Sequence, residues 1–122
     1  MSKLTIIPHY LLAIMLVVFG LNKFLNFMPM PEPTGQAADF MEAITGSFIW
    51  PTLGILYVLC GILLAINKAV GLATVILAPL AFCALMYHIT LDLANIPGAA
   101  IFAVLLVITM IGNAGKYKAL LS

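Results

Sequence analysis

The sequence contains no arginine, and its charged side chains are only five lysines and four acidic residues among 122 positions. Without arginine the chain lacks the guanidinium groups that grip a phosphate through two hydrogen bonds. A formal net charge of +1 also provides no basic surface for nucleic acid. We therefore exclude nucleic-acid binding.

Polar segments are equally scarce, because 65% of the residues are hydrophobic and the mean hydropathy is +1.23. A soluble domain of 122 residues has too much surface for its volume to hide this apolar area from water. The composition predicts an integral membrane protein, with residues 1–122 forming a single domain. Met28-Pro29-Met30-Pro31 follows the first apolar run in place of a small-residue cleavage site, so we expect this run to be a retained helix and not a signal peptide.

The two cysteines, Cys60 and Cys83, lie inside apolar runs and form no Cys-x-x-Cys motif. Buried free cysteines behave as small hydrophobic residues. In the helices predicted below, the two are offset by about 9 Å at a rise of about 1.5 Å per residue, whereas a disulfide needs Cα atoms within about 7 Å. The sequence therefore disfavours a disulfide-exchange enzyme.

Four apolar segments are long enough to cross a bilayer, at about 4–27, 48–66, 69–91 and 97–115. A spanning helix needs about 20 such residues and satisfies its own backbone polar groups in lipid. Short links between the last three segments make them antiparallel neighbours. We predict an all-α, antiparallel bundle of four transmembrane helices.

Charges fix the orientation of these spans. One side of the alternating spans carries four lysines, Lys3, Lys68, Lys116 and Lys118, and the other carries all four acids, Glu32, Asp39, Glu42 and Asp92. Lysines collect on the cytoplasmic side of membrane proteins. Both termini are therefore predicted to be cytoplasmic, with Lys23 alone among the lysines on the outer side.

The first outer loop is predicted to contain a short amphipathic helix at about 36–45, lying over the outer end of the bundle with its apolar face down. Thr34 is the expected N-cap, and Gly46 is the expected end. Three prolines predict an extended entry to this helix: Pro29, Pro31 and Pro33.

Each span also carries a stripe of small or polar residues at steps of three and four. These stripes should face the bundle axis, because close backbone approach and polar contacts drive helix association in lipid. They predict a narrow polar interior that is widest toward the outside. The four stripes are His9, Ala13, Leu16, Gly20 and Lys23; Trp50, Gly54, Tyr57, Gly61 and Ala65; Thr74, Ala78, Ala81, Leu85, His88 and Asp92; and Gly98, Phe102, Leu105, Thr109, Gly112 and Lys116.

A candidate pocket follows at the outer end, where the ionisable residues of two spans reach similar depths. Its predicted residues are Lys23, His88, Asp92, Tyr57, Asn22 and Trp50. In a functional interpretation Lys23 or His88 donates a hydrogen bond to a quinone carbonyl or another polar headgroup, and Asp92 orients His88. In a structural interpretation Lys23 pairs with Asp92 or reaches outward, and His88 ties two helices together.

Trp50 is also explained as an interfacial anchor, and His9, near the other end of the first span, is expected to form an interfacial hydrogen bond. Met28, Met30, Met41 and His88 could supply ligands for Cu(I), but flexible methionine packing is commoner than such a site, so no metal site is predicted.

Several short motifs resemble the DoxX family of small four-helix membrane proteins, which includes DoxD-like and DoxX-like members. They are Val18-Phe19-Gly20-Leu21-Asn22-Lys23-Phe24, Leu53-Gly54-Ile55, Cys60-Gly61-Ile62-Leu63-Leu64-Ala65-Ile66-Asn67, Tyr87-His88-Ile89-Thr90-Leu91-Asp92 and Ile96-Pro97-Gly98. The resemblance implies a bacterial inner-membrane protein of this fold. Some relatives are subunits of quinone-linked oxidoreductases, such as thiosulfate:quinone oxidoreductase, and others are linked to oxidative-stress complexes.

The chain departs from the family pattern at two positions. His9 stands where relatives often carry an arginine, and Tyr57 stands where they often carry a glutamate. Losing both charges weakens a redox or proton-transfer role. The first hypothesis is a non-catalytic membrane subunit or scaffold, which needs a protein partner and allows a homo-oligomer; the alternative is a quinone-binding or quinone-reducing subunit of an oxidoreductase. A transporter is disfavoured because no inverted repeat or broken helix is evident.

Overall fold

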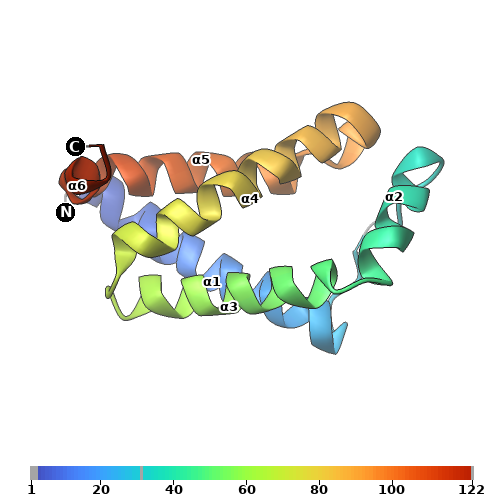
Figure 1. The fold of residues 1–122 in the computed structure, drawn as a ribbon, viewed down its shortest axis with the longest axis horizontal. Coiled ribbons are helices and arrows are strands. Elements are labelled where there is room, and N and C mark those ends of the chain that lie inside the picture. The colour runs from blue at the N-terminus through green and yellow to red at the C-terminus, as the bar shows by residue number, and fades with distance from the viewer. Residues whose placement is uncertain (1–2, 31, 122) are drawn as a thin grey trace.

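A computed structural model describes residues 3–30 and 32–121, and every regular element within them is helical. Four long helices lie side by side: α1 (Lys3–Leu25), α3 (Ile49–Ala65), α4 (Val70–Leu91) and α5 (Pro97–Gly112) (Figure 1). The shorter elements are α2 (Gln36–Thr45), the 3-10 turns η1 (Leu93–Asn95) and η2 (Ala114–Tyr117), and α6 (Lys118–Leu121). The long helices match the four predicted apolar segments to within three residues at each end.

Helix length and hydropathy support a membrane protein. Leu4–Leu25 and Val70–Leu91 are each long and apolar enough to cross a bilayer alone. Two further spans arise if each bent pair of helices counts as one: α2 with α3, bent by 76°, and α5 with the segment Ala114–Leu120, bent by 83°. The described part of the chain thus holds two to four candidate spans.

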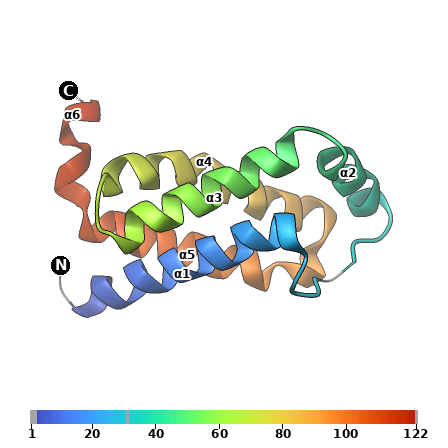
Figure 2. The same ribbon diagram turned by 90° about the horizontal axis from the view of Figure 1, so that it is seen from below.

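The four long helices follow one another around the bundle in the order α1, α3, α4, α5, because α1 packs mainly on α3 and α5, and α4 packs on the other sides of the same two helices. Both ends of the chain lie at one end of the bundle, together with the α3–α4 turn (Figures 1 and 2). We call this the terminal end. The opposite end, crossed by α2, is the α2 end.

Glycines bring α1 and α3 into close contact. A methyl group on Gly61 would lie 3.0 Å from the carbonyl oxygen of Ala13, and one on Gly20 would lie 3.0 Å from that of Gly54. Larger residues at these positions would push the two backbones apart. The predicted small-residue stripes of these two helices therefore do form their interface.

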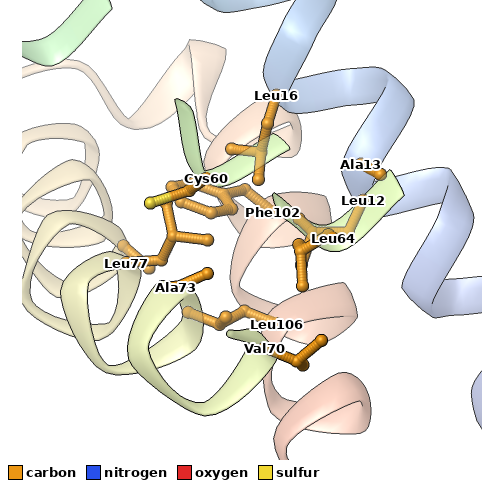
Figure 3. Close-up of a cluster of buried hydrophobic side chains, with 11 residues drawn as sticks. Leu12, Ala13, Leu16, Cys60, Leu64, Val70, Ala73, Leu77, Phe102 and Leu106 are labelled. Carbon is orange, nitrogen blue, oxygen red and sulfur yellow. The ribbon is translucent and has the colours of Figure 1, made fainter. Parts of the chain in front are cut away.

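The centre of the bundle is apolar, and leucines from all four long helices fill it (Figure 3). Leu12, Leu64 and Leu77 are fully buried, although none belongs to a predicted stripe. Conversely, Ala65, Gly98 and Lys116 are exposed, which corrects their assignment to the interior; Leu64 and Ala99 are buried in the places expected for Ala65 and Gly98. The assignment fails because the stripes follow small residues, whereas large side chains are needed to fill the space between helices where the helices diverge.

Buried polar residues gather mainly at the terminal end, so the predicted widening of a polar interior toward the α2 end is wrong. His9, Thr74, Thr109 and Asn113 are buried near the terminal end, whereas Asn22 is the buried polar residue near the α2 end. Three of them donate hydrogen bonds to backbone carbonyl oxygens: Thr74 to Val70 (2.9 Å), Thr109 to Leu105 (2.8 Å), and His9 through Nε2 to Leu64 (2.8 Å). The predicted hydrogen bond of His9 is confirmed.

The predicted loop helix is confirmed as α2, with the predicted bounds and with Gly46 as its C-cap. Thr34 is not the N-cap; Gly35 takes that place with a φ of 61°, in the left-handed region that favours glycine. On its inner face Ala37 is buried and Phe40 stacks on Tyr87 of α4, with ring centroids 5.4 Å apart. Of the predicted extended entry, residues 29–30 and 32–34 have no regular structure, and Pro31 lies outside the described residues.

Candidate functional site

Lys23 of α1 occupies the centre of the predicted outer cluster. Its ammonium group lies 4.0 Å from the ring centroid of Trp50 and 5.1 Å from that of Tyr57, both on α3. Tyr57 in turn meets Phe102 of α5 edge-on, at 5.6 Å between centroids. A cation over an aromatic face is attracted by the ring quadrupole, and desolvation strengthens the attraction to about 2 kcal/mol. The half-buried Lys23 is therefore held in an aromatic corner between α1 and α3.

Asn22 and Trp50 fasten the end of α1. The side chain of Asn22 accepts a hydrogen bond from the backbone N–H of Met28 at 2.8 Å and donates one to the carbonyl oxygen of Met28 at 3.3 Å. The indole N–H of Trp50 donates to the carbonyl oxygen of Lys23 at 3.3 Å, a group left without a helical partner near the end of α1. Both predicted pocket residues thus hold the backbone in place, and Trp50 also forms one wall beside Lys23.

His88 and Asp92 form a separate local arrangement at the end of α4. The Nδ1–H of His88 donates to the backbone carbonyl of Asp92 at 3.1 Å, and the Asp92 carboxylate accepts two contacts from the Asn95 amide at 2.9 and 3.0 Å. Asp92 thus contacts His88, as the functional interpretation expects, but through its backbone carbonyl and not through its carboxylate. The reason is local: α4 ends at Leu91, and Asp92 turns away with φ −151° and ψ 61°.

The six predicted pocket residues consequently fall into two groups. Asn22, Lys23, Trp50 and Tyr57 lie together between α1 and α3, whereas His88 and Asp92 lie on α4, across the bundle from α1. Within the described residues, Lys23 and Asp92 form no ion pair, and His88 makes no hydrogen bond to another long helix. Two of the structural alternatives drawn from the sequence are therefore wrong.

Two surface hollows lie away from these residues. One, of about 380 Å³, opens at the terminal end and is lined by Asn67, Gly112, Asn113, Gly115 and Lys116. A second is a purely apolar depression on α5, lined by Ala100, Ile101, Val104 and Leu105. Neither includes a predicted pocket residue. Sequence reasoning missed the terminal hollow, although the asparagines that adjoin the α3–α4 turn and the end of α5 were a polar signal for it.

The remaining chemical groups offer few ligands. Both cysteines are free thiols, Cys60 buried and Cys83 exposed. Among the described residues, no three His, Cys, Asp or Glu side chains gather as they would around a metal ion. The Nε2 atom of His9 donates a hydrogen bond to the carbonyl oxygen of Leu64, and its Nδ1 atom is buried without a hydrogen-bond partner.

Comparison of the chain with protein-family models, curated proteins and solved structures finds no match in any of the three.

Proposed function

We propose that this chain is a DoxX-like membrane protein of four spans that serves as a non-catalytic subunit or scaffold of a larger complex. The short motifs that resemble the DoxX family support the family assignment, and the apolar helices support the membrane environment. The lysines at the terminal end, facing acids at the α2 end, support a bacterial inner membrane with both termini in the cytoplasm.

The observation that carries the non-catalytic role is the way the polar groups at the α2 end are used. Asn22, Trp50 and His88 each bind a backbone carbonyl, and the Asp92 carboxylate binds a side-chain amide. A general acid or base needs to reach the reacting group of a substrate. These side chains instead fasten the ends of helices, and the two groups of ionisable residues lie apart.

Gentle extraction from the native membrane, followed by native mass spectrometry, tests this role. A scaffold should leave the membrane with a partner in fixed stoichiometry, and His88→Ala should preserve both that stoichiometry and the activity of the complex. His88→Ala removes one local hydrogen bond and should cost about 1 kcal/mol of stability. A complex that assembles normally but loses its activity with His88→Ala would contradict the proposal.

Quinone binding is the second candidate, and a single observation favours it. Lys23 presents an ammonium group in an aromatic corner, where no carboxylate among the described residues neutralises it. A quinone suits such a corner, because its ring stacks on aromatic side chains and its carbonyl oxygen accepts a hydrogen bond from the ammonium.

A short-chain ubiquinone should then raise the unfolding temperature of the purified protein as its binding site fills. At a quinone concentration one hundred times the dissociation constant, the free energy of unfolding should increase by about 2.7 kcal/mol. Lys23→Met should abolish the shift, and Lys118→Met, which removes an exposed lysine at the other end, should retain it. An unchanged melting temperature in the parent protein would eliminate this candidate.

A further inference from the structure

We infer that the hollow at the terminal end binds the phosphate of an anionic lipid headgroup, with Lys116 as its cationic contact. The hollow has a volume of about 380 Å³, within the usual range for a small-ligand site. This inference rests on the proposed four-span arrangement, which places the hollow at the membrane surface, but it does not depend on the scaffold role.

The lining provides hydrogen-bond donors and a positive charge. Asn67, Asn113 and Lys116 are the polar residues of the lining, and Gly115 has open space around its Cα. The amide of Asn113 is partly committed, because it donates to the carbonyl oxygen of Thr109 at 2.8 Å. Lys116 is exposed and provides the positive charge of the lining.

The position of Lys116 is fixed by two helices. A methyl group on Gly71 would lie 3.4 Å from the Cβ of Lys116, so the stem of this lysine runs against the first turn of α4. Its backbone N–H also donates to the carbonyl oxygen of Asn113 at 2.9 Å, within the turn that ends α5. These contacts hold the backbone and Cβ of Lys116 next to the first turn of α4, at the hollow that this residue lines.

No side-chain carboxylate competes for this charge. All four acidic side chains, Glu32, Asp39, Glu42 and Asp92, belong to the loops and short helix of the α2 end. Lys68 and Lys118 add to the positive potential of the terminal end. An anion is therefore the ligand that the electrostatics favour, and phosphate accepts hydrogen bonds from both ammonium and amide groups.

The surroundings favour a phosphate that belongs to a lipid over a soluble one. Large apolar side chains are exposed close to the lining: Ile111 (67% exposed) precedes the lining residue Gly112 on α5. Leu72 (60% exposed) follows Gly71 on α4, which packs against Lys116. Acyl chains can lie along these surfaces while the headgroup occupies the polar hollow. Basic sites between membrane helices on the cytoplasmic side suit such anionic headgroups.

The test uses the full chain in detergent, supplied with either phosphatidylglycerol or phosphatidylcholine at equal mole fraction. Native mass spectrometry should show one retained phosphatidylglycerol per chain and no comparable retention of phosphatidylcholine. Lys116→Gln should weaken the retention about tenfold, as expected for the loss of one charge-assisted hydrogen bond. Lys118→Gln, which removes an equal charge outside the lining, should change it by no more than about twofold.

A second variant removes the site without altering charge. Nothing lies within 4 Å of a methyl group placed on Gly115, and its φ is not positive, so Gly115→Leu should fold normally and fill the hollow. It should lower phosphatidylglycerol retention as much as Lys116→Gln does. Equal losses in Lys116→Gln and Lys118→Gln, equal retention of the two lipids, or full retention in Gly115→Leu would each overturn the inference.

Soluble glycerol phosphate separates the two sources of phosphate. It should give less than about a tenth of the thermal protection that phosphatidylglycerol gives at the same concentration, because it lacks the acyl chains that pack on α4 and α5. Equal protection by glycerol phosphate alone would overturn the assignment to lipid. Cysteine labelling of the two bundle ends, described below, tests the four-span arrangement independently of this site.

Discussion

Glycine residues contribute strongly to the α1–α3 interface, because lipid does not drive apolar helix faces together as water does. Close van der Waals contact must supply the association energy, and the contact depends on single atoms. Gly20 packs on the backbone of Gly54, and Gly61 packs on that of Ala13. A methyl group on either glycine would lie only 3.0 Å from the facing carbonyl oxygen, which is closer than an ordinary van der Waals contact. A methyl group placed on Gly98, by contrast, would have no atom within 4 Å.

Gly61→Ala should therefore destabilise the protein, and Gly98→Ala should not. Alanine gains about 1 kcal/mol of helix propensity at an interior helical position, whereas overpacking costs about 1–3 kcal/mol. We expect a net loss of up to about 2 kcal/mol for Gly61→Ala and little change or a slight gain for Gly98→Ala. Denaturant unfolding in detergent measures both, and equal stability of the two variants would show that the α1–α3 contact can relax.

Residue spacing predicted this interface but not the partners of the ionisable groups. Gly20, Gly54 and Gly61 lie on stripes at steps of three and four, which any helix of that sequence must present on one face. The cation–aromatic contacts of Lys23 depend on side-chain rotamers, and the contacts of Asp92 depend on where α4 stops. Neither property follows from spacing along a chain.

At the scale of elements, the segment after α5 is a bent arm and not a loose tail. Gly112 ends the helix, and η2 and α6 continue at 83° to it, across the terminal end of the bundle (Figure 2). The phenol of Tyr117 forms a 2.6 Å hydrogen bond with the buried hydroxyl of Thr74 on α4. That contact joins the arm to the bundle and keeps Lys116 beside the terminal hollow.

Tyr117→Phe should free this arm. The hydrogen bond is worth about 0.5–1.5 kcal/mol, so amide hydrogen exchange over residues 114–121 should accelerate about two- to tenfold while exchange in α1 and α3 stays unchanged. Tyr10→Phe is the matched control, since the Tyr10 side chain is 39% exposed on α1. Exchange rates that are equal in the two variants would mean that other contacts hold the arm.

Hydropathy predicted the long helices well because burial in lipid requires long apolar runs, and it predicted α2 because the period of its apolar residues is helical. It placed the end of the last span at 115, whereas α5 ends at Gly112. The apolar run gave no reason to stop there. The stop instead comes from Asn113, whose side chain caps the carbonyl oxygen of Thr109 and whose backbone leaves the helix.

For the whole molecule, the separation of charges between the two ends predicts its orientation. In a variant without native thiols (Cys60→Ala, Cys83→Ala), Glu42→Cys places a thiol on exposed α2, and Lys118→Cys places one at the terminal end. A membrane-impermeant maleimide applied to intact spheroplasts should label Glu42→Cys. It should label Lys118→Cys only after the membrane is permeabilised, because lysine-rich ends remain in the cytoplasm. The opposite pattern would invert the proposed topology.

The four long helices differ in length. With 23 and 22 residues, α1 and α4 extend about 35 and 33 Å, whereas α3 and α5, with 17 and 16 residues, extend only about 26 and 24 Å. The hydrocarbon layer of a typical bilayer is about 30 Å thick. Long and short helices alternate around the bundle, so in the proposed four-span arrangement a surrounding bilayer meets a surplus of hydrophobic length at two corners and a deficit at the other two. Tilting relieves the surplus, but the deficit draws the two leaflets together, so this protein would locally thin the membrane that contains it.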